Sequence, residues 1–127
     1  MDAAANETGA LVILVEEEPD ERSAMSSLLR AAGFSVAAAD TTDQALHLLE
    51  CSTEASALVT DAHVPGEIDG WELAQRVRQS RPELAVVLIS GHSDPTSGPL
   101  PDGAEFILKP NVVANLVPTL QRLTKTR

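Results

Sequence analysis

The sequence has few basic residues, almost no aromatic residues and a single cysteine. Lys and Arg number 9 against 19 Asp and Glu, so the net charge at pH 7 is −10. A surface of this sign repels phosphate backbones and anionic lipids, which argues against binding to nucleic acid or to a membrane through general electrostatics. Aromatic residues make up 2% of the chain. Leu, Val, Ile and Ala must therefore fill the interior.

The sequence also has no disulfide partner, no secretion signal and no membrane-length apolar run. Cys51 cannot form an internal disulfide, which is typical of a reduced compartment. The polar N-terminus has no basic region, and the longest apolar run, Ala10–Val15, is far shorter than a membrane span. We predict a cytoplasmic protein with a disordered leader over residues 1–10 and one domain over residues 11–127.

Strand and helix patterns alternate along the chain. Five short segments have the apolar character of strands in a covered sheet, namely Leu11–Val15, Phe34–Ala39, Ala57–Thr60, Ala85–Ile89 and Glu105–Leu108. Helical spacing begins near Asp20, Thr41, Trp71 and Val113. This alternation predicts an α/β fold with a parallel sheet and right-handed crossovers. The second strand is poor in large apolar residues and suits an edge, so we expect a flavodoxin-like, doubly wound, five-stranded sheet in the order 2-1-3-4-5.

Polar residues stand where four of these strands end. Glu16 and Glu17 follow the first strand, Asp61 the third, Ser90 the fourth and Lys109 the fifth. In the expected strand order, ligands bind at the carboxyl ends of strands one and three, where the winding reverses. Three carboxylates and one ammonium leave a negative charge that a divalent cation would balance, and Mg²⁺ prefers oxygen ligands. Each residue alone fits a solvated loop or a turn, but the ordered set is more specific.

This arrangement suits phosphoryl transfer to a carboxylate. Asp61 would attack a phosphoryl group and form an acyl phosphate. Mg²⁺ and Lys109 would spread positive charge over the phosphoryl oxygens in the transition state. The Ser90 hydroxyl would donate a hydrogen bond to the product phosphate. The residues therefore predict a magnesium-dependent phosphoacceptor site.

These residues resemble the receiver domain of bacterial two-component response regulators over roughly residues 11–123. The resemblance rests on the segments "ILVEEEP", "LVTDAHVPGEIDGWELA", "VVLISGHSD" and "FILKP". It implies that Asp61 accepts a phosphoryl group from a histidine kinase or a histidine phosphotransfer protein, with an unknown downstream protein as the target. It also implies that Mg²⁺ is held by Glu16, Glu17, Asp61 and the backbone carbonyl of His63. Enzymatic activity would be limited to slow self-phosphorylation from small donors and autodephosphorylation.

Some residues depart from the pattern of that family. The acidic pair normally contains aspartate, usually at the position of Glu17, and the longer glutamate side chain could displace the metal or reach it through water. Phe106 falls at the aromatic switch position but carries no hydroxyl group. By contrast, Lys109 followed by Pro110 matches the family, in which the two residues are usually joined by a cis peptide bond.

The segment Gly91–Gly103, "GHSDPTSGPLPDG", stands where the family normally has its fourth helix. It contains three prolines, Pro95, Pro99 and Pro101. Because proline in a helix interior costs about 3 kcal/mol, we predict that this helix is short or absent. Leu100 is the only large apolar residue of the segment, so we also predict that phosphorylation orders the segment instead of shifting a preformed helix.

Other functions remain open. The same fold could be a pseudo-receiver, a docking module with weak or no phosphotransfer because of Glu17. A magnesium-dependent phosphohydrolase fits less well, because such enzymes usually place the nucleophile after the first strand. A nucleotide-binding switch is disfavoured, because the sequence has no G-x-x-x-x-G-K-[ST] loop. The last predicted helix ends close to Arg127, so we expect the output to lie in a protein partner, a phosphorelay step or a domain outside this chain.

Overall fold

The five strands form one parallel sheet in the order β2-β1-β3-β4-β5. The structure, a computed structural model, describes residues 9–91 and 100–124. The strands are β1 (Leu11–Val15), β2 (Ser35–Ala39), β3 (Ala55–Asp61), β4 (Ala85–Ser90) and β5 (Glu105–Leu108). Every neighbouring pair is parallel. The predicted flavodoxin-like order is thus confirmed, with β2 at an edge.

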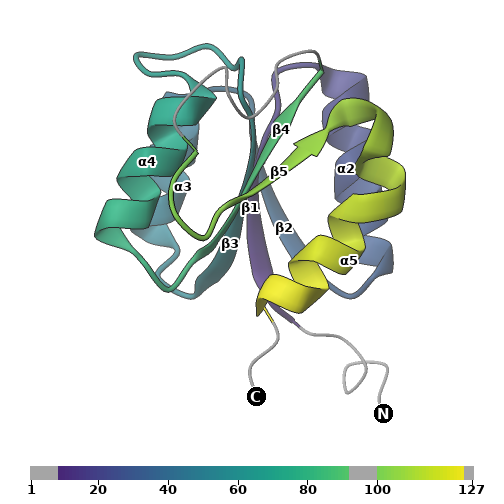
Figure 1. Cartoon of the computed structure of the whole chain (residues 1–127). Coiled ribbons are helices and arrows are strands. Elements are labelled where there is room, and N and C mark those ends of the chain that lie inside the picture. Colours follow the sequence, from purple (N-terminus) through teal and green to yellow (C-terminus); the bar gives the residue numbers. More distant parts are fainter. Residues whose placement is uncertain (1–8, 92–99, 125–127) are drawn as a thin grey trace.

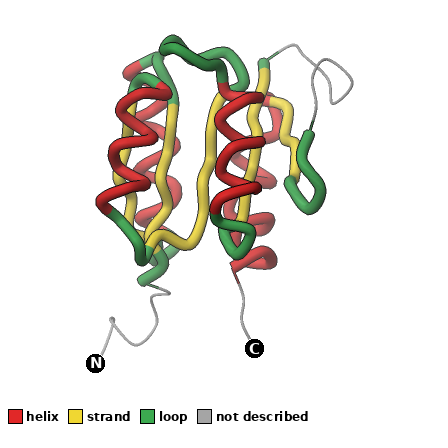
Figure 2. The backbone as a smooth tube through the Cα atoms, turned by 90° about the vertical axis from the view of Figure 1, so that its left-hand side faces the viewer, coloured by secondary structure: helices red, strands yellow, loops and turns green. Residues whose placement is uncertain are grey.

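Helices cover both faces of the sheet. The described residues form four α-helices and one short 3₁₀ helix: α2 (Pro19–Ala31), α3 (Thr42–Cys51), α4 (Gly70–Ser80), α5 (Val112–Thr124) and η2 (Lys109–Asn111). Helices α2 and α5 lie on one face, and α3 and α4 lie on the other (Figure 1). Figure 2 shows the helices running alongside the strands, with loops at the two ends of the sheet. Because all the strands are parallel, the residues that directly follow the strands lie together at one of these ends, the carboxyl-terminal edge of the sheet.

Two apolar cores lie on opposite sides of the sheet. Successive side chains of a strand point to opposite faces. Ile13 and Val15 of β1 pack into the core beneath α3 and α4, whereas Val12 and Leu14 pack into the core beneath α2 and α5. These four side chains have no exposed surface. The uninterrupted apolar run at the start of the domain is thus the signature of a strand covered on both faces.

Polar side chains fix where the helices begin. The Thr41 hydroxyl accepts a hydrogen bond from the Gln44 N–H at 3.1 Å, as the capping-box pattern predicts. The Gln44 side chain accepts from the N–H of Asp40, not from that of Thr41. Glu18 caps α2 by accepting from the Glu21 N–H at 2.9 Å. The cap at Glu18 directs the chain from β1 straight into α2.

The predicted loss of the family's fourth helix falls largely on residues 92–99, which lie outside the described residues. The described part of the connection from β4 to β5, residues 100–104, contains no helix. It turns through Gly103, at a φ of 83°. The Ala104 N–H donates to the Pro101 carbonyl at 3.0 Å. The predicted ordering of the segment on phosphorylation and most of the predicted leader also lie outside the described residues.

Across residues 9–91 and 100–124, no helix combines the length and the apolar character needed to cross a membrane.

Candidate functional site

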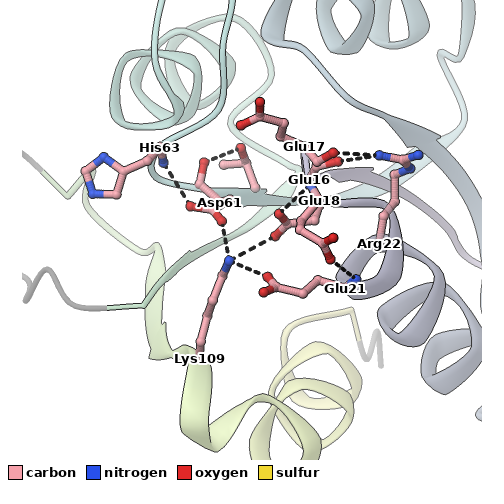
Figure 3. Close-up of polar contacts among 9 residues, drawn as sticks. Glu16, Glu17, Glu18, Glu21, Arg22, Asp61, His63 and Lys109 are labelled. Atoms are coloured by element: carbon pink, nitrogen blue, oxygen red, sulfur yellow. Dashed lines mark hydrogen bonds and ion pairs between the residues drawn. The ribbon is translucent and has the colours of Figure 1, made fainter.

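The carboxyl ends of β1, β3 and β5 bring Glu16, Asp61 and Lys109 together (Figure 3). Lys109 follows β5, which is two strands away from β3, and its long side chain bridges that gap. The Lys109 Nζ lies 2.7 Å from Asp61 Oδ2 and 3.4 Å from Glu16 Oε1. These three residues therefore form one ion-paired cluster, and all three were predicted from the sequence to lie at this edge.

Asp61 is held ready as an ionised carboxylate. Its side chain is 8% exposed, and its Oδ1 accepts a hydrogen bond from the His63 N–H at 2.9 Å. Burial raises the pKa of Asp61, but the His63 N–H and the Lys109 ammonium outweigh it, so the pKa lies below the ordinary value of 3.8. At neutral pH the Asp61 side chain is therefore an anionic carboxylate with a fixed orientation.

Glu16 is a buried acid that is only partly satisfied. The residue is 2% exposed, and its Oε2 accepts a hydrogen bond from the Glu18 N–H at 3.1 Å. Among the described residues its Oε1 has no hydrogen-bond partner, and it lies 3.4 Å from the Lys109 ammonium. Burial raises the pKa of Glu16 to about 7. A divalent cation would satisfy this oxygen, so the residues present fit a magnesium ion.

Lys109 is the positive charge of the site. Burial alone would lower its pKa, but the hydrogen bonds to Asp61 and Glu21 outweigh burial and raise the pKa above its ordinary value. The lysine is therefore fully protonated at neutral pH. No cis peptide bond occurs among the described residues, so Lys109 and Pro110 are joined by a trans bond, in contrast to the family's usual cis bond.

Glu21 belongs to the cluster although the sequence analysis did not identify it. Its Oε1 lies 2.5 Å from the Lys109 Nζ. Carboxylate oxygens of Glu16, Glu21 and Asp61 lie within 4.8 Å of one another, as a shared metal site requires. Glu21 stands in the first turn of α2, the helix that leaves the end of β1. That position is the signal that could have found it, because the first turn of a helix after a strand stays at the same edge of the sheet.

Glu17 is exposed at the rim of the same crevice. The crevice has a volume of about 660 Å³, and Glu17 lines it together with Glu16, Asp61 and Lys109. Its carboxylate is not among the three that lie within 4.8 Å of one another. The Arg22 guanidinium donates to the Glu16 and Glu17 carbonyls at 2.9 and 3.1 Å, which fixes the backbone between β1 and α2.

Ser90 and His63 complete the predicted set. Ser90 is the last residue of β4 and has no exposed surface. His63 approaches the site through its backbone: its N–H bonds to Asp61, while its ring points away from the carboxylates (Figure 3). The structure thus places the backbone of His63, and not its imidazole, beside the Asp61 carboxylate.

Tight backbone contacts set the position of Asp61. Gly70, the first residue of α4, lies against the end of β3, where a Cβ atom would fall 2.0 Å from the Asp61 carbonyl oxygen. The Gly70 N–H donates to the Ala62 carbonyl at 3.0 Å. The buried Thr42 hydroxyl holds the same loop by donating to the Ile68 carbonyl at 2.8 Å. Substitutions at these contacts would therefore act on the acceptor through the backbone.

The aromatic pair of the domain lies beside β5. Trp71 and Phe106 stack with their ring centroids 6.0 Å apart and an interplanar angle of 15°. Trp71 is 6% exposed and belongs to the core beneath α3 and α4. Trp71 therefore packs between α4 and the sheet as a core residue.

Comparison with known proteins identifies similar sequences. The family model for the response regulator receiver domain matches residues 12–121. The C4-dicarboxylate transport transcriptional regulatory protein DctD of Rhizobium meliloti (strain 1021) is 32% identical over 119 residues, which cover 91% of this chain and 25% of that protein. The chain therefore spans about a quarter of the length of this relative. The two-component response regulator ORR5 of Oryza sativa subsp. japonica is 36% identical over 104 residues, covering 78% of this chain and 77% of that protein.

Solved structures share the fold. A response regulator receiver protein from Sinorhizobium medicae WSM419 has a TM-score of 0.83 and 28% identity, covering 92% of this chain and 95% of that chain. The response regulator TrrA from Thermotoga maritima, solved in complex with Mg²⁺-BeF, has a TM-score of 0.79 and 23% identity, covering 90% of this chain and 98% of that chain. At that identity the second likeness shows the fold alone.

Proposed function

Because the chain belongs to the response regulator receiver domain family, whose model matches residues 12–121, we propose that Asp61 accepts a phosphoryl group in two-component signalling. The observation that carries this proposal is the buried, ionised carboxylate of Asp61 held between the His63 N–H and the Lys109 ammonium. A carboxylate fixed in this way can act as a nucleophile without first losing a proton.

The donor would be a phosphohistidine on a histidine kinase or a phosphotransfer protein. An oxygen of Asp61 forms a bond to phosphorus while the P–N bond to the donor imidazole breaks. The electron pair of that bond goes to the imidazole nitrogen, which takes up a proton from solvent. Asp61 ends as an acyl phosphate. The same attack on a small phosphodonor would give slow self-phosphorylation.

The neighbouring side chains have separate roles in this proposal. The Lys109 ammonium, already 2.7 Å from Asp61, stabilises negative charge on the transferred group. The Ser90 hydroxyl donates a hydrogen bond to the product phosphate. Mg²⁺, when bound, would neutralise charge on the phosphoryl oxygens. It would be held by the carboxylates of Glu16 and Asp61 and by the backbone carbonyl of His63. Glu17, at the rim of the crevice, would reach it through water.

The partners and location follow from this role. We infer a phosphohistidine protein upstream and a protein target downstream, in the cytoplasm. The net charge of −10 favours protein partners over nucleic acid for this domain. This chain matches only a quarter of the transcriptional regulator DctD, so the match does not identify the downstream target of this chain.

Intact mass spectrometry after incubation with acetyl phosphate and Mg²⁺ tests the proposal. We expect one phosphoryl adduct on the wild-type chain and none on Asp61→Asn. Asp40→Asn is the matched control, because Asp40 is an exposed aspartate that directly follows the neighbouring strand β2. It should be phosphorylated like the wild type. An equal adduct on Asp61→Asn would contradict the proposal.

The pseudo-receiver is the second candidate, and Glu17 favours it. This residue stands where the family usually has aspartate, and its side chain lies outside the group of three carboxylates. In the same experiment, a wild-type chain that gains no adduct at any Mg²⁺ concentration would favour a docking module.

A further inference from the structure

We propose that Glu21 is a positioning residue that holds the Lys109 ammonium and competes for it with the incoming phosphoryl group. This inference rests on the proposed phosphorylation of Asp61. It concerns a residue outside the predicted set, and it assigns to this residue a restraining effect on the phosphorylated state.

The Lys109 ammonium donates hydrogen bonds to Glu21 and Asp61 and forms a longer ion pair with Glu16. Its Nζ lies 2.5 Å from Glu21, 2.7 Å from Asp61 and 3.4 Å from Glu16. An ammonium group can donate three hydrogen bonds and accepts none. A phosphoryl oxygen that approaches Lys109 therefore competes with these carboxylates for its positive charge.

Asp61 itself carries the phosphoryl group, so Glu16 and Glu21 are the carboxylates that can lose the ammonium, and exposure identifies Glu21 as the one that gives way. The side chains of Asp61 and Glu16 are 8% and 3% exposed, whereas that of Glu21 is 46% exposed. A buried carboxylate that loses its cation has no water to replace it, so the loss is costly. The half-exposed carboxylate of Glu21 can take up water instead. Release of Glu21 is thus the least costly way to free the lysine.

Charge gives the direction of the effect. Phosphorylation replaces the single negative charge of the Asp61 carboxylate with the nearly double charge of an acyl phosphate, while the carboxylate of Glu21 stays within reach of the same ammonium. Like charges at such a separation repel each other at a partly exposed site. Glu21 therefore opposes the phosphorylated state in two ways, by occupying Lys109 and by repelling the new charge. Neutralising Glu21 should favour the phosphoryl group.

Open space beside Glu21 allows its side chain to move away from Lys109. Glu21 and Lys109 line both the crevice around Asp61 and a neighbouring groove of about 310 Å³. The groove lies between α2 and α5 and is otherwise apolar, with Met25, Leu28 and Val113 among its lining residues. The ion pair between Glu21 and Lys109 thus lies at the boundary between the crevice and the groove. The open side of the crevice lets the Glu21 carboxylate turn towards solvent when Lys109 leaves it.

Isothermal titration with beryllofluoride and Mg²⁺, a stable mimic of the phosphoryl group, measures this competition. We expect Glu21→Gln to bind the mimic about three- to tenfold more tightly than the wild type, with a smaller gain at high salt. Glu21→Asp keeps the charge but has a side chain one methylene shorter, so it should gain less than Glu21→Gln. Asp20→Asn is the matched control, because it removes the same charge from the same turn of α2, and it should also stay close to the wild type.

A double-mutant cycle in urea unfolding with Glu21→Gln and Lys109→Gln checks the pair without any phosphoryl mimic. We expect a favourable coupling between the two positions. A merely structural role for Glu21 would weaken binding of the mimic, so equal or weaker binding by Glu21→Gln overturns the inference. If the wild type binds the mimic and Glu21→Gln gains nothing, only this inference fails. If the wild type neither binds the mimic nor is phosphorylated, the proposed function fails and this inference with it.

Discussion

At the scale of single residues, the buried carboxylate of Glu16 lowers the stability of the metal-free protein. It is 2% exposed, and one of its carboxylate oxygens has no hydrogen-bond partner. Burial raises its pKa to about 7 from an ordinary value of 4.5. Between these two pH values the folded state binds more protons than the unfolded state. Stability therefore falls as pH rises through this range.

The substitution Glu16→Gln should remove this penalty. Without metal at pH 8, we expect the variant to be more stable than the wild type by on the order of 2 kcal/mol. At pH 4 the charge-related difference should vanish, because Glu16 is then largely protonated in both states. Urea unfolding at the two pH values measures it. A variant that is less stable at pH 8 than at pH 4, relative to the wild type, would refute the burial argument.

The contribution of Asp61 to stability changes with pH in the opposite direction. Its pKa is lowered, mainly because the His63 N–H and the Lys109 ammonium overcome the effect of burial. Its contribution to stability is therefore present above the ordinary pKa and is lost as pH falls through the lower folded value. The stability contributions of Glu16 and Asp61 thus change with pH in opposite directions, because hydrogen-bond donors and positive charge outweigh burial only at Asp61.

At the scale of elements, the contact between β3 and α4 fixes the backbone of Asp61. Gly70→Ala would place a Cβ atom 2.0 Å from the Asp61 carbonyl oxygen, so the start of α4 or the end of β3 must shift. We expect a loss of about 2 kcal/mol in the free energy of unfolding and slower phosphorylation by acetyl phosphate. Urea unfolding and intact mass measure the two effects.

Gly91→Ala is the control for the stability effect, because a Cβ atom there would meet Lys109 Cδ at 3.6 Å, an ordinary contact. Its free energy of unfolding should stay near that of the wild type. Equal stability of Gly70→Ala and the wild type would show that the backbone at Asp61 is less constrained than the contact implies.

The elements that sequence predicted well are those with strong local signals. The strand from Glu105 to Leu108 has the predicted bounds, and the apolar run of β1 does too. Strand β3 begins at Ala55, two residues before the predicted start. Ala55 and Ser56 are small residues with little strand preference, and the pairing of Leu11 with Ala55 extends the strand. Tertiary pairing, which local pattern does not contain, decided that boundary.

At the scale of the whole molecule, the site depends on contacts between distant parts of the chain. The strand ends were predictable, because parallel strands bring their carboxyl ends to one edge. Glu21 was not, because its role comes from Lys109, which is 88 residues away in the sequence. Its local surroundings show only a helix start, where acidic residues are common. The reach of a lysine across β4 is a property of the folded sheet.

Mg²⁺ should stabilise the whole domain. Binding to the folded state alone adds about 2.7 kcal/mol when the metal is at a hundred times its dissociation constant. We expect the melting temperature to rise when Mg²⁺ is added and to fall back to the metal-free value when EDTA removes the metal. Because the net charge is −10, NaCl at matched ionic strength controls for screening. Glu16→Gln should lose most of the rise, and an equal rise in NaCl would show that no specific site exists.

The most direct test of the central claim locates the acyl phosphate. Protein phosphorylated with acetyl phosphate and Mg²⁺ is reduced with borohydride, which converts a phosphorylated aspartate to homoserine, and is then digested and sequenced by mass spectrometry. We predict homoserine at position 61 and an unmodified peptide from Asp61→Asn. A reduced carboxyl group at another position, or none in a chain that carries the adduct, would contradict the assignment of Asp61 as the phosphoacceptor.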